Sequence, residues 1–265
     1  MNESQAAVIR GKQRKPKIIH WQTYCDGHDG TTKMPEYLAK NYWWAYLSPV
    51  GVYFFDLPFV VNRILWGQYN KIANDVVKLL ATQSDYSMAQ ISCAYGDIIP
   101  KTGTESNSNN IYLFDIAAIQ LEQARKKIKA NNTADIFNLF EANAESIPLA
   151  NDSVDTSLLF FLLHELPEET RNNVFKETLR ITKPGGRIII ADYSPITNSH
   201  WFHKMSFFRN IFEKIEPFLG NFWRADLNQE IANAAHSMSK CTTQKHESKY
   251  WHGYYRLMEF SVKSD

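Results

Sequence analysis

The sequence predicts an α/β fold in which a mostly parallel sheet is covered by helices on both faces. From residue 88 onward, short apolar segments alternate with segments of helical periodicity, which is typical of parallel strands joined by crossover helices. The segment 156–163 is apolar throughout, as expected of a strand buried on both faces. Two further segments, 242–250 and 254–262, are predicted to pair as antiparallel strands at one edge. We therefore expect a seven-stranded sheet with an antiparallel edge strand.

The elements between the first and the fifth strand follow one another in a regular order. The helix at 117–130 carries Leu121 and Ile128 on one face and basic residues on the other, so its apolar face is expected to lie on the sheet. A turn is expected at 107–110, and a helical insertion at about 200–235. The predicted order is strand 88–93, strand 111–115, helix 117–130, strand 136–141, strand 156–163, helix 168–182 and strand 187–192.

A helical, aromatic region is predicted at residues 34–80, before the sheet begins. Tyr42, Trp43 and Tyr46 recur at helix-like spacing, and a second helix is expected at 59–80. We interpret this region as a lid that contacts the substrate. Residues 81–265 then form the nucleotide-binding α/β domain.

The first 33 residues are predicted to form a flexible basic arm. The whole chain has a net charge of +1, which argues against a polycationic nucleic-acid-binding protein. A local basic run is typical of a solvated arm, of contact with an anionic membrane surface or of a targeting remnant, and these three interpretations stay open. The run consists of Arg10, Lys12, Arg14, Lys15 and Lys17.

The cysteine pattern and the hydropathy predict an intracellular protein. The 3 cysteines are far apart and show no CxxC spacing, which argues against a disulfide framework and favours a reducing compartment. No secretory signal is expected at the N-terminus. No stretch reaches the roughly 18–20 apolar residues that a bilayer-spanning helix needs.

Polar residues stand where the first two predicted strands end. Asp97 follows the first strand, and Asp115 ends the second. Ligands of open α/β sheets bind at the carboxyl ends of the strands. The Asp115 carboxylate can accept hydrogen bonds from both ribose hydroxyls of a nucleoside, and it can also cap the helix that follows. The two roles are compatible.

Two further segments carry a family resemblance. Together with Asp115, the segments Glu141–Asp155 and Leu179–Ile190 resemble class I S-adenosylmethionine-dependent methyltransferases, most closely the ubiquinone and menaquinone C-methyltransferase branch. The resemblance implies a Rossmann-like fold and S-adenosylmethionine as cofactor. It places the adenine ring at Asn143 and Ala144. The full predicted cofactor set is Ala94, Tyr95, Gly96, Asp97, Asp115, Ile116, Asn143 and Ala144.

The cofactor loop departs from the pattern of that branch. A Gly-Gly-Thr-Gly-Asp-like sequence is replaced by Cys93-Ala94-Tyr95-Gly96-Asp97. Glycines in such loops allow positive φ and a close approach of the backbone to the ligand. The altered loop indicates either a cofactor that is held differently or a site that has lost its ligand.

A narrower resemblance covers about residues 34–225. The block Tyr42–Leu47, the loop Ala94–Asp97 and the segment Phe160–Glu165 resemble the rhodoquinone biosynthesis protein family, RquA. This resemblance implies that ubiquinone is converted to rhodoquinone by replacing a ring methoxy group with an amino group. It implies S-adenosylmethionine as amino donor and a divalent metal, Mn²⁺ above all. Tyr95 would then turn the amino acid end of the cofactor toward the quinone.

His164 and Glu165 follow the apolar fourth strand and are predicted to face the cofactor. Metal ligation, proton transfer and simple helix capping are the three interpretations of this pair. Tyr95, His164 and Glu165 are the candidate catalytic residues. His164, Glu165 and Asp97 are the candidate metal ligands, and the sequence does not decide among them.

The aromatic residues before the sheet are predicted to line the substrate entrance. The candidates are Tyr42, Trp43, Tyr46 and Trp66, with ordinary packing of the lid as the alternative. A lipid substrate implies peripheral contact with the inner membrane, on the cytoplasmic face in a bacterium, or in a mitochondrion or mitochondrion-related organelle in a eukaryote. No nucleic-acid partner is expected, and the oligomeric state is left open. A quinone or phenol methyltransferase and a non-catalytic quinone-pathway subunit are the two rival functions.

Overall fold

One eight-stranded sheet organises the computed structural model, which describes residues 18–20, 34–196 and 216–265. The strand order is β1-β4-β3-β2-β5-β6-β8-β7. The strands from β1 to β6 pair in parallel, whereas β8 runs antiparallel to both β6 and β7. The strands are β1 (Ile18–His20), β2 (Tyr86–Ile91), β3 (Ser108–Asp115), β4 (Phe137–Glu141), β5 (Val154–Phe160), β6 (Thr182–Tyr193), β7 (Lys240–Tyr250) and β8 (Tyr255–Ser264).

The predicted fold class is confirmed, with one added strand. All seven predicted strands are present, and the C-terminal two form the expected antiparallel pair. The eighth strand, β1, lies within the segment that the sequence predicts to be a flexible arm, and it pairs in parallel with Leu139–Glu141 of β4. The prediction is wrong for these three residues because the free edge of β4 offers unpaired backbone groups to an extended segment. The basic run of the arm lies outside the described residues.

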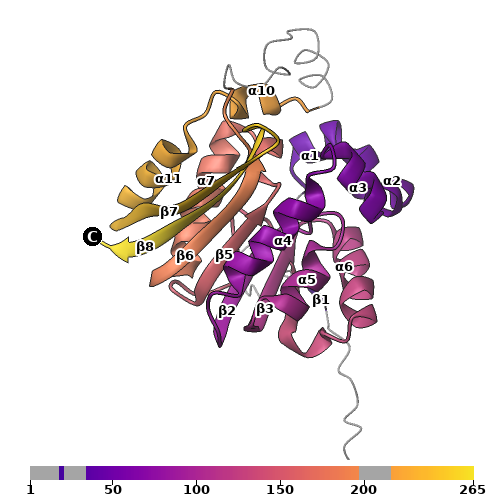
Figure 1. Cartoon of the computed structure of the whole chain (residues 1–265), viewed down its shortest axis with the longest axis horizontal. Coiled ribbons are helices and arrows are strands. Elements are labelled where there is room, and N and C mark those ends of the chain that lie inside the picture. Colours follow the sequence, from indigo (N-terminus) through magenta and orange to yellow (C-terminus); the bar gives the residue numbers. More distant parts are fainter. Residues whose placement is uncertain (1–17, 21–33, 197–215) are drawn as a thin grey trace, which may run out of the picture.

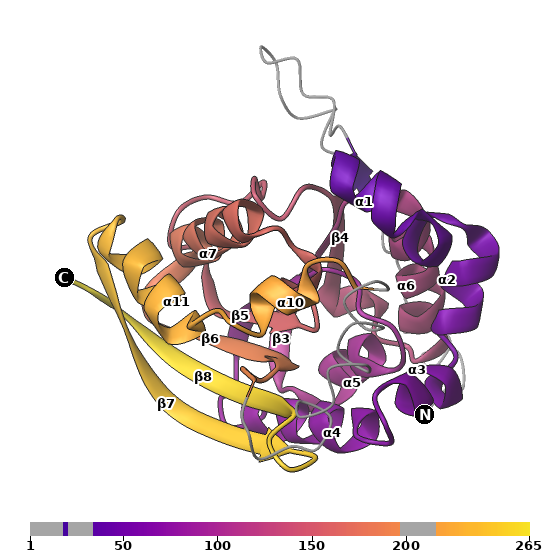
Figure 2. The same ribbon diagram turned by 90° about the horizontal axis from the view of Figure 1, so that it is seen from above.

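Helices cover both faces of the sheet, as Figures 1 and 2 show. On one side, α4 contacts α5 and α5 contacts α6, and on the other α7 packs against α11. Strand β5 between these layers is almost fully buried, as predicted from its apolar run. The helices of the two layers are α4 (Tyr69–Leu80), α5 (Ile98–Glu105), α6 (Ala118–Ala130), α7 (Glu168–Ile181) and α11 (Leu227–His236).

The lid consists of short helices at the carboxyl edge of the sheet. Its elements are α1 (Glu36–Asn41), the π-helical turn η2 (Trp43–Leu47), α2 (Pro49–Phe55) and α3 (Pro58–Ile64). The continuous helix predicted at 59–80 is instead two helices, α3 and α4. They separate at Trp66 and Gly67, which both have left-handed backbone angles, with φ of 53° and 76°. Because α4 packs on α5 and the sheet, it belongs to the helical layer rather than to the lid.

Two further details differ from the sequence prediction. Helix α5 was not predicted, because Pro100 and Gly103 both weaken a helical pattern. Pro100 stands in the first turn, where it is tolerated, and a side chain at Gly103 would come within 2.6 Å of the Phe137 ring. The turn predicted at 107–110 is wrong because β3 already begins at Ser108.

The described part of the predicted 200–235 insertion contains α10 (Leu219–Phe222) and most of α11, and the rest lies outside the described residues. Two short 3₁₀ turns, η3 (Ala134–Ile136) and η4 (Leu163–Glu165), complete the described elements. Within the described ranges, no helix combines the length and the apolar character needed to cross a bilayer.

Candidate functional site

A cavity of about 470 Å³ lies between the lid and the carboxyl ends of β2, β3 and β5. Its size is in the range of small-molecule sites, and its lining is mostly apolar. We call the part formed by Cys93–Tyr95, Asp115 and Asn143 the cofactor end. We call the part formed by Tyr46, His164, Glu165 and Glu216, with Asp192 behind His164, the acid–base end.

Asp115 organises the cofactor end through the backbone. One carboxylate oxygen accepts a hydrogen bond from the Cys93 amide at 2.7 Å, and the other accepts one from the Ala117 amide at 2.8 Å. Burial raises the pKa of Asp115 to about 6, although these backbone bonds favour its charged form. Each oxygen keeps a further lone pair, so the carboxylate can still accept from a ribose hydroxyl. Asp115 and its neighbour Ile116 both line the cavity.

The altered loop brings Tyr95 into the cavity and ties it to the lid. The Tyr95 hydroxyl donates to the carbonyl oxygen of Ala45 at 2.6 Å and accepts from Nε2 of Gln120 at 3.1 Å. Its ring stacks on Tyr46, with centroids 5.2 Å apart and planes 6° from parallel. Burial raises the pKa of Tyr95 well above its ordinary range. The phenol therefore acts here as a positioning group between loop and lid.

The backbone of this loop turns at Ser92 and Gly96, which have φ of 78° and 83°. A side chain at Gly96 would come within 2.4 Å of the Tyr69 hydroxyl, so only glycine fits this turn. The Gly96 amide donates to Asp56 at 3.0 Å, which fixes the loop to the end of α2. Ala94 and Tyr95 line the cavity, but Gly96 and Asp97 do not, and Asp97 pairs instead with Lys101 at 3.8 Å.

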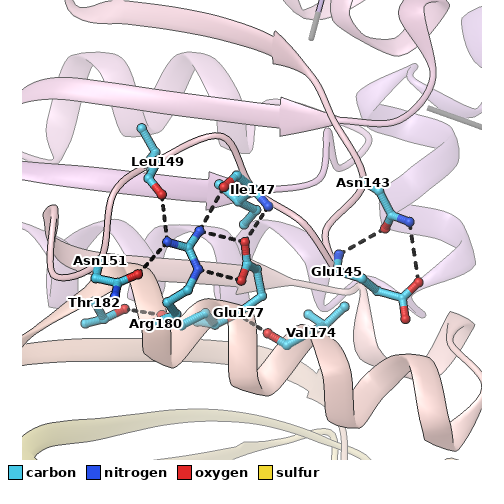
Figure 3. Close-up of polar contacts among 10 residues, drawn as sticks. Asn143, Glu145, Ile147, Leu149, Asn151, Val174, Glu177, Arg180 and Thr182 are labelled. Atoms are coloured by element: carbon cyan, nitrogen blue, oxygen red, sulfur yellow. Dashed lines mark hydrogen bonds and ion pairs between the residues drawn. The ribbon is translucent and has the colours of Figure 1, made fainter. Parts of the chain in front are cut away.

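The segment that begins with the predicted adenine residues is joined to α7 by polar contacts at Ile147 and Leu149 (Figure 3). Asn143 lines the cavity together with Ala144, and its side-chain oxygen accepts from the Glu145 amide at 2.9 Å. Further along, Arg180 donates to the carbonyl oxygens of Ile147 and Leu149 at 2.8 and 2.7 Å. Because these hydrogen bonds hold the loop in one conformation, little conformational entropy would be lost when it binds a flat ring such as adenine.

The acid–base end begins with His164, on the turn η4. Its Nδ1 lies 2.8 Å from Oδ1 of Asp192 in a fully buried ion pair, and its Nε2 lies 3.8 Å from the Glu165 carboxylate. Burial opposes protonation of the ring, but Asp192, Glu165 and Glu216 outweigh it and raise the pKa of His164 to about 9. His164 is therefore an imidazolium at neutral pH.

Glu165 faces the cavity beside this imidazolium and accepts a hydrogen bond from the Tyr46 hydroxyl. Burial, helped by the nearby Glu216 carboxyl group and opposed by His164, raises the pKa of Glu165 to about 8. Burial likewise raises the pKa of Glu216. A carboxyl group with such a pKa can exchange a proton near neutral pH, as a general acid or base requires.

Sequence reasoning missed two members of the acid–base end. Asp192 was predicted as the last residue of a strand, but its partnership with His164, 28 residues earlier, depends on the pairing of β5 with β6. Glu216 reaches the cavity from a segment far along the chain. Its position in a generally aromatic and basic stretch was the only available signal.

The predicted substrate residues occupy different places. Tyr46 and Trp66 line the cavity, and Trp66 stacks on Trp251 with centroids 5.2 Å apart. Tyr42 also lines it, but its side chain is almost fully buried and packs edge-on against Tyr46. Trp43 is exposed and does not line the cavity.

The predicted manganese site has no matching ligand set. Within residues 18–20, 34–196 and 216–265, no group of three His, Cys, Asp or Glu side chains could hold a metal ion. Of the three candidate ligands, Asp97 does not line the cavity that His164 and Glu165 share.

Known proteins with related sequences are quinone-pathway methyltransferases. A ubiquinone/menaquinone biosynthesis C-methyltransferase UbiE from Geotalea daltonii is 26% identical over 165 residues, which cover 62% of this chain and 68% of that protein. The enzyme of the same name from Pectobacterium atrosepticum is 29% identical over 100 residues, 37% of this chain and 39% of that protein. A demethylmenaquinone methyltransferase from Paenarthrobacter aurescens is 32% identical over 98 residues, 37% of this chain and 38% of that protein.

Solved structures share the fold. An O-methyltransferase family protein from Burkholderia thailandensis is similar with a TM-score of 0.55 and 14% identity, over 78% of this chain and 60% of that one. A SAM-dependent methyltransferase from Aquifex aeolicus gives 0.50 and 13% identity, over 72% and 88%. The sequence pattern of the ubiE/COQ5 methyltransferase family matches residues 60–245, which include the cofactor loop, Asp115, His164 and Glu165. The chain therefore belongs to the ubiE/COQ5 methyltransferase family.

Proposed function

We propose that this chain transfers a group from S-adenosylmethionine to the ring of a lipid quinone. The proposal rests on one observation, a cavity that joins the cofactor end to the acid–base end. At the cofactor end, the Asp115 carboxylate is placed where it could accept hydrogen bonds from ribose hydroxyls. Asp115, Asn143 and the Cys93–Tyr95 loop would hold the cofactor. When bound, S-adenosylmethionine supplies either an electrophilic methyl group or a nucleophilic α-amine.

Methyl transfer is the reaction that the comparisons support better. The relatives are named as C-methyltransferases of ubiquinone and menaquinone biosynthesis, and the family match covers most of this chain. In this reaction, the acid–base end removes a proton from the ring that receives the methyl group. Glu165 is the group whose position in the cavity suits that task.

Amino transfer, which would convert ubiquinone to rhodoquinone, is the finer proposal. It is supported by the altered loop, in which the ring of Tyr95 occupies the cavity beside Tyr46. This ring takes up space that a glycine loop would leave for the amino acid end of the cofactor, so that end would be directed toward the acid–base end. An amine must lose its proton before it can attack a ring carbon, and Glu165 could accept that proton. The methoxy group would then leave the ring as methanol, and the bond between this nitrogen and the α-carbon of the cofactor would have to break to complete the transfer.

The product decides between the two reactions. The chain would be expressed in a bacterium that makes ubiquinone but not rhodoquinone, and in a second strain that lacks its own quinone C-methyltransferase, and the lipids would be analysed by mass spectrometry. Rhodoquinone in the first strain supports amino transfer, and a restored methylated quinone in the second supports methyl transfer. No new quinone in either strain, together with no S-adenosylmethionine binding by calorimetry, would favour a non-catalytic subunit instead.

A further inference from the structure

The exposed large apolar side chains of the described residues all lie between residues 43 and 66. Val50 and Phe59 are the most exposed of them, each at 79%. Soluble proteins seldom expose so many large apolar side chains within one segment. We therefore infer that this surface contacts another molecule. We call it the apolar face and define it by Trp43, Val50, Phe54, Leu57, Phe59 and Ile64.

The apolar face belongs to η2, α2 and α3, which stand at the outer side of the molecule, away from β5 and β6 (Figures 1 and 2). Phe54 of the face packs against Phe55, with centroids 5.2 Å apart, and Phe55 also contacts Trp44 and Tyr95, at 5.3 and 6.1 Å. The face therefore rests on a packed aromatic layer, and its exposed side chains project outward from a fixed support.

The exposed charge within residues 43–66 is positive. Between residues 43 and 66 the only charged residues are Asp56 and Arg63. Asp56 is buried and neutralised by Lys127 at 2.6 Å, whereas Arg63 is exposed. Lys126 adds a second cation, since its ammonium lies 4.7 Å from the centre of the Tyr53 ring. The face thus shows cations and no exposed carboxylate of its own.

The apolar face is continuous with the mouth of the cavity. Ile64 belongs to the face and lines the cavity, and its neighbours Arg63 and Trp66 line it as well. An apolar molecule on this face could enter the cavity along side chains of one segment, without crossing open water.

We propose that the apolar face inserts into the interfacial layer of an anionic lipid bilayer, and that the substrate enters the cavity from there. Aromatic side chains with a cationic rim match the interface of such a bilayer. A second copy of the chain fits less well, because a two-fold contact through this face would bring the cations of both copies together. The entry route rests on the proposed quinone substrate, whereas the docking does not.

Flotation of the full chain with vesicles tests the docking, with no quinone or cofactor present. Vesicles of phosphatidylcholine mixed with phosphatidylglycerol should carry the wild type, and vesicles of phosphatidylcholine alone should carry less of it. Phe54→Ser combined with Phe59→Ser should lower the partition coefficient at least tenfold, about the effect of withdrawing one or two buried phenyl rings. Arg63→Glu should lower it roughly fivefold or more at low salt and less at high salt.

Lys78→Glu is the matched control, because Lys78 is an exposed cation on α4, outside the lid. It should float like the wild type, and thermal melting should show that every variant is folded. Equal flotation of Phe54→Ser/Phe59→Ser and wild type would overturn the proposal. So would a wild-type dimer that does not float and that these substitutions convert to a monomer. Asp115→Ala should still float, so that failure of docking and failure of the proposed reaction are distinguished.

Discussion

The two ends of the cavity are built in different ways. At the cofactor end, one carboxylate, Asp115, is satisfied by two backbone amides of the loops it joins. At the acid–base end, Glu165, Asp192 and Glu216 surround a single imidazolium, so buried negative charge exceeds positive charge if all three are ionised. At the cofactor end, hydrogen bonds fix the position of the loop. At the acid–base end, burial raises the pKa of the carboxyl groups, so that they can exchange protons more readily near neutral pH. The difference supports our proposal that one end binds the cofactor and the other carries out the chemistry.

The largest effect is expected from Asp115→Ala. This substitution removes two charge-assisted hydrogen bonds, each worth roughly 1.5–3 kcal/mol, that hold the cofactor loop. We expect the affinity for S-adenosylmethionine, measured by calorimetry, to fall at least about a hundredfold. Asp115→Asn keeps one acceptor oxygen and should lose less. Wild-type affinity in Asp115→Ala would separate the cofactor from this end of the cavity.

Gly96→Ala should have the next largest effect, and the quantity to measure is the stability of the protein. The new methyl group would meet the Tyr69 hydroxyl at 2.4 Å in a left-handed turn. We expect a loss of about 3 kcal/mol in the free energy of unfolding, measured with urea, from backbone strain and overpacking together. Gly185→Ala is the matched control, because Gly185 has a similar φ of 85° but open space around it, so only the strain of about 1 kcal/mol applies. Equal losses would contradict the packing of the loop against α4.

The acid–base end should make stability depend on pH. Folding raises the pKa of Glu165 from 4.5 to about 8 and that of His164 from 6.5 to about 9, so both groups gain protons on folding. Their contribution is full below the unfolded pKa and is lost as pH rises through the folded one. We expect the free energy of unfolding to fall between about pH 4.5 and 9, most steeply where both groups titrate, by at most ~1.4 kcal/mol per pH unit for each proton.

Glu165→Gln should flatten this pH profile, because it removes one of the two titrating groups and lowers the pKa of the other. Glu105→Gln, at an exposed position on α5, serves as control and should keep the wild-type slope. A Glu165→Gln profile that follows the wild type at every pH would show that Glu165 is not buried as described.

Tyr95→Phe should have the smallest effect. It keeps the stacked ring but removes the hydrogen bond to the Ala45 carbonyl, which is worth about 1 kcal/mol. We expect amide hydrogen exchange in residues 43–55 to become about fivefold faster, since the lid loses its tie to the loop. Tyr112→Phe also removes a hydroxyl contact, at 2.8 Å from Asn110, but away from the lid. The same acceleration in both variants would exclude a specific tie.

The cofactor end was largely accessible from the sequence, and the acid–base end was not. Asp115 ends one predicted strand and Asn143 follows another, and the carboxyl ends of parallel strands share one edge of a sheet. In contrast, the contact of Tyr95 with Ala45 spans 50 residues, and that of His164 with Asp192 spans 28. Such contacts depend on the strand order and on the break between α3 and α4. The periodicity of the sequence does not reveal this break, because it lies at Trp66, a residue type that seldom adopts the left-handed backbone conformation found there.

The most direct test of the central claim follows the cofactor's atoms into the quinone. Purified protein would be incubated with lipid quinones in vesicles and with S-adenosylmethionine that carries ¹³C in its methyl group and ¹⁵N in its amine. We expect one label to enter the quinone ring in the wild type and none in Asp115→Ala. Ring-bound ¹⁵N would support amino transfer, and ¹³C methyl transfer. A folded protein that binds S-adenosylmethionine but leaves every quinone unlabelled would contradict the assignment of quinone-ring transferase.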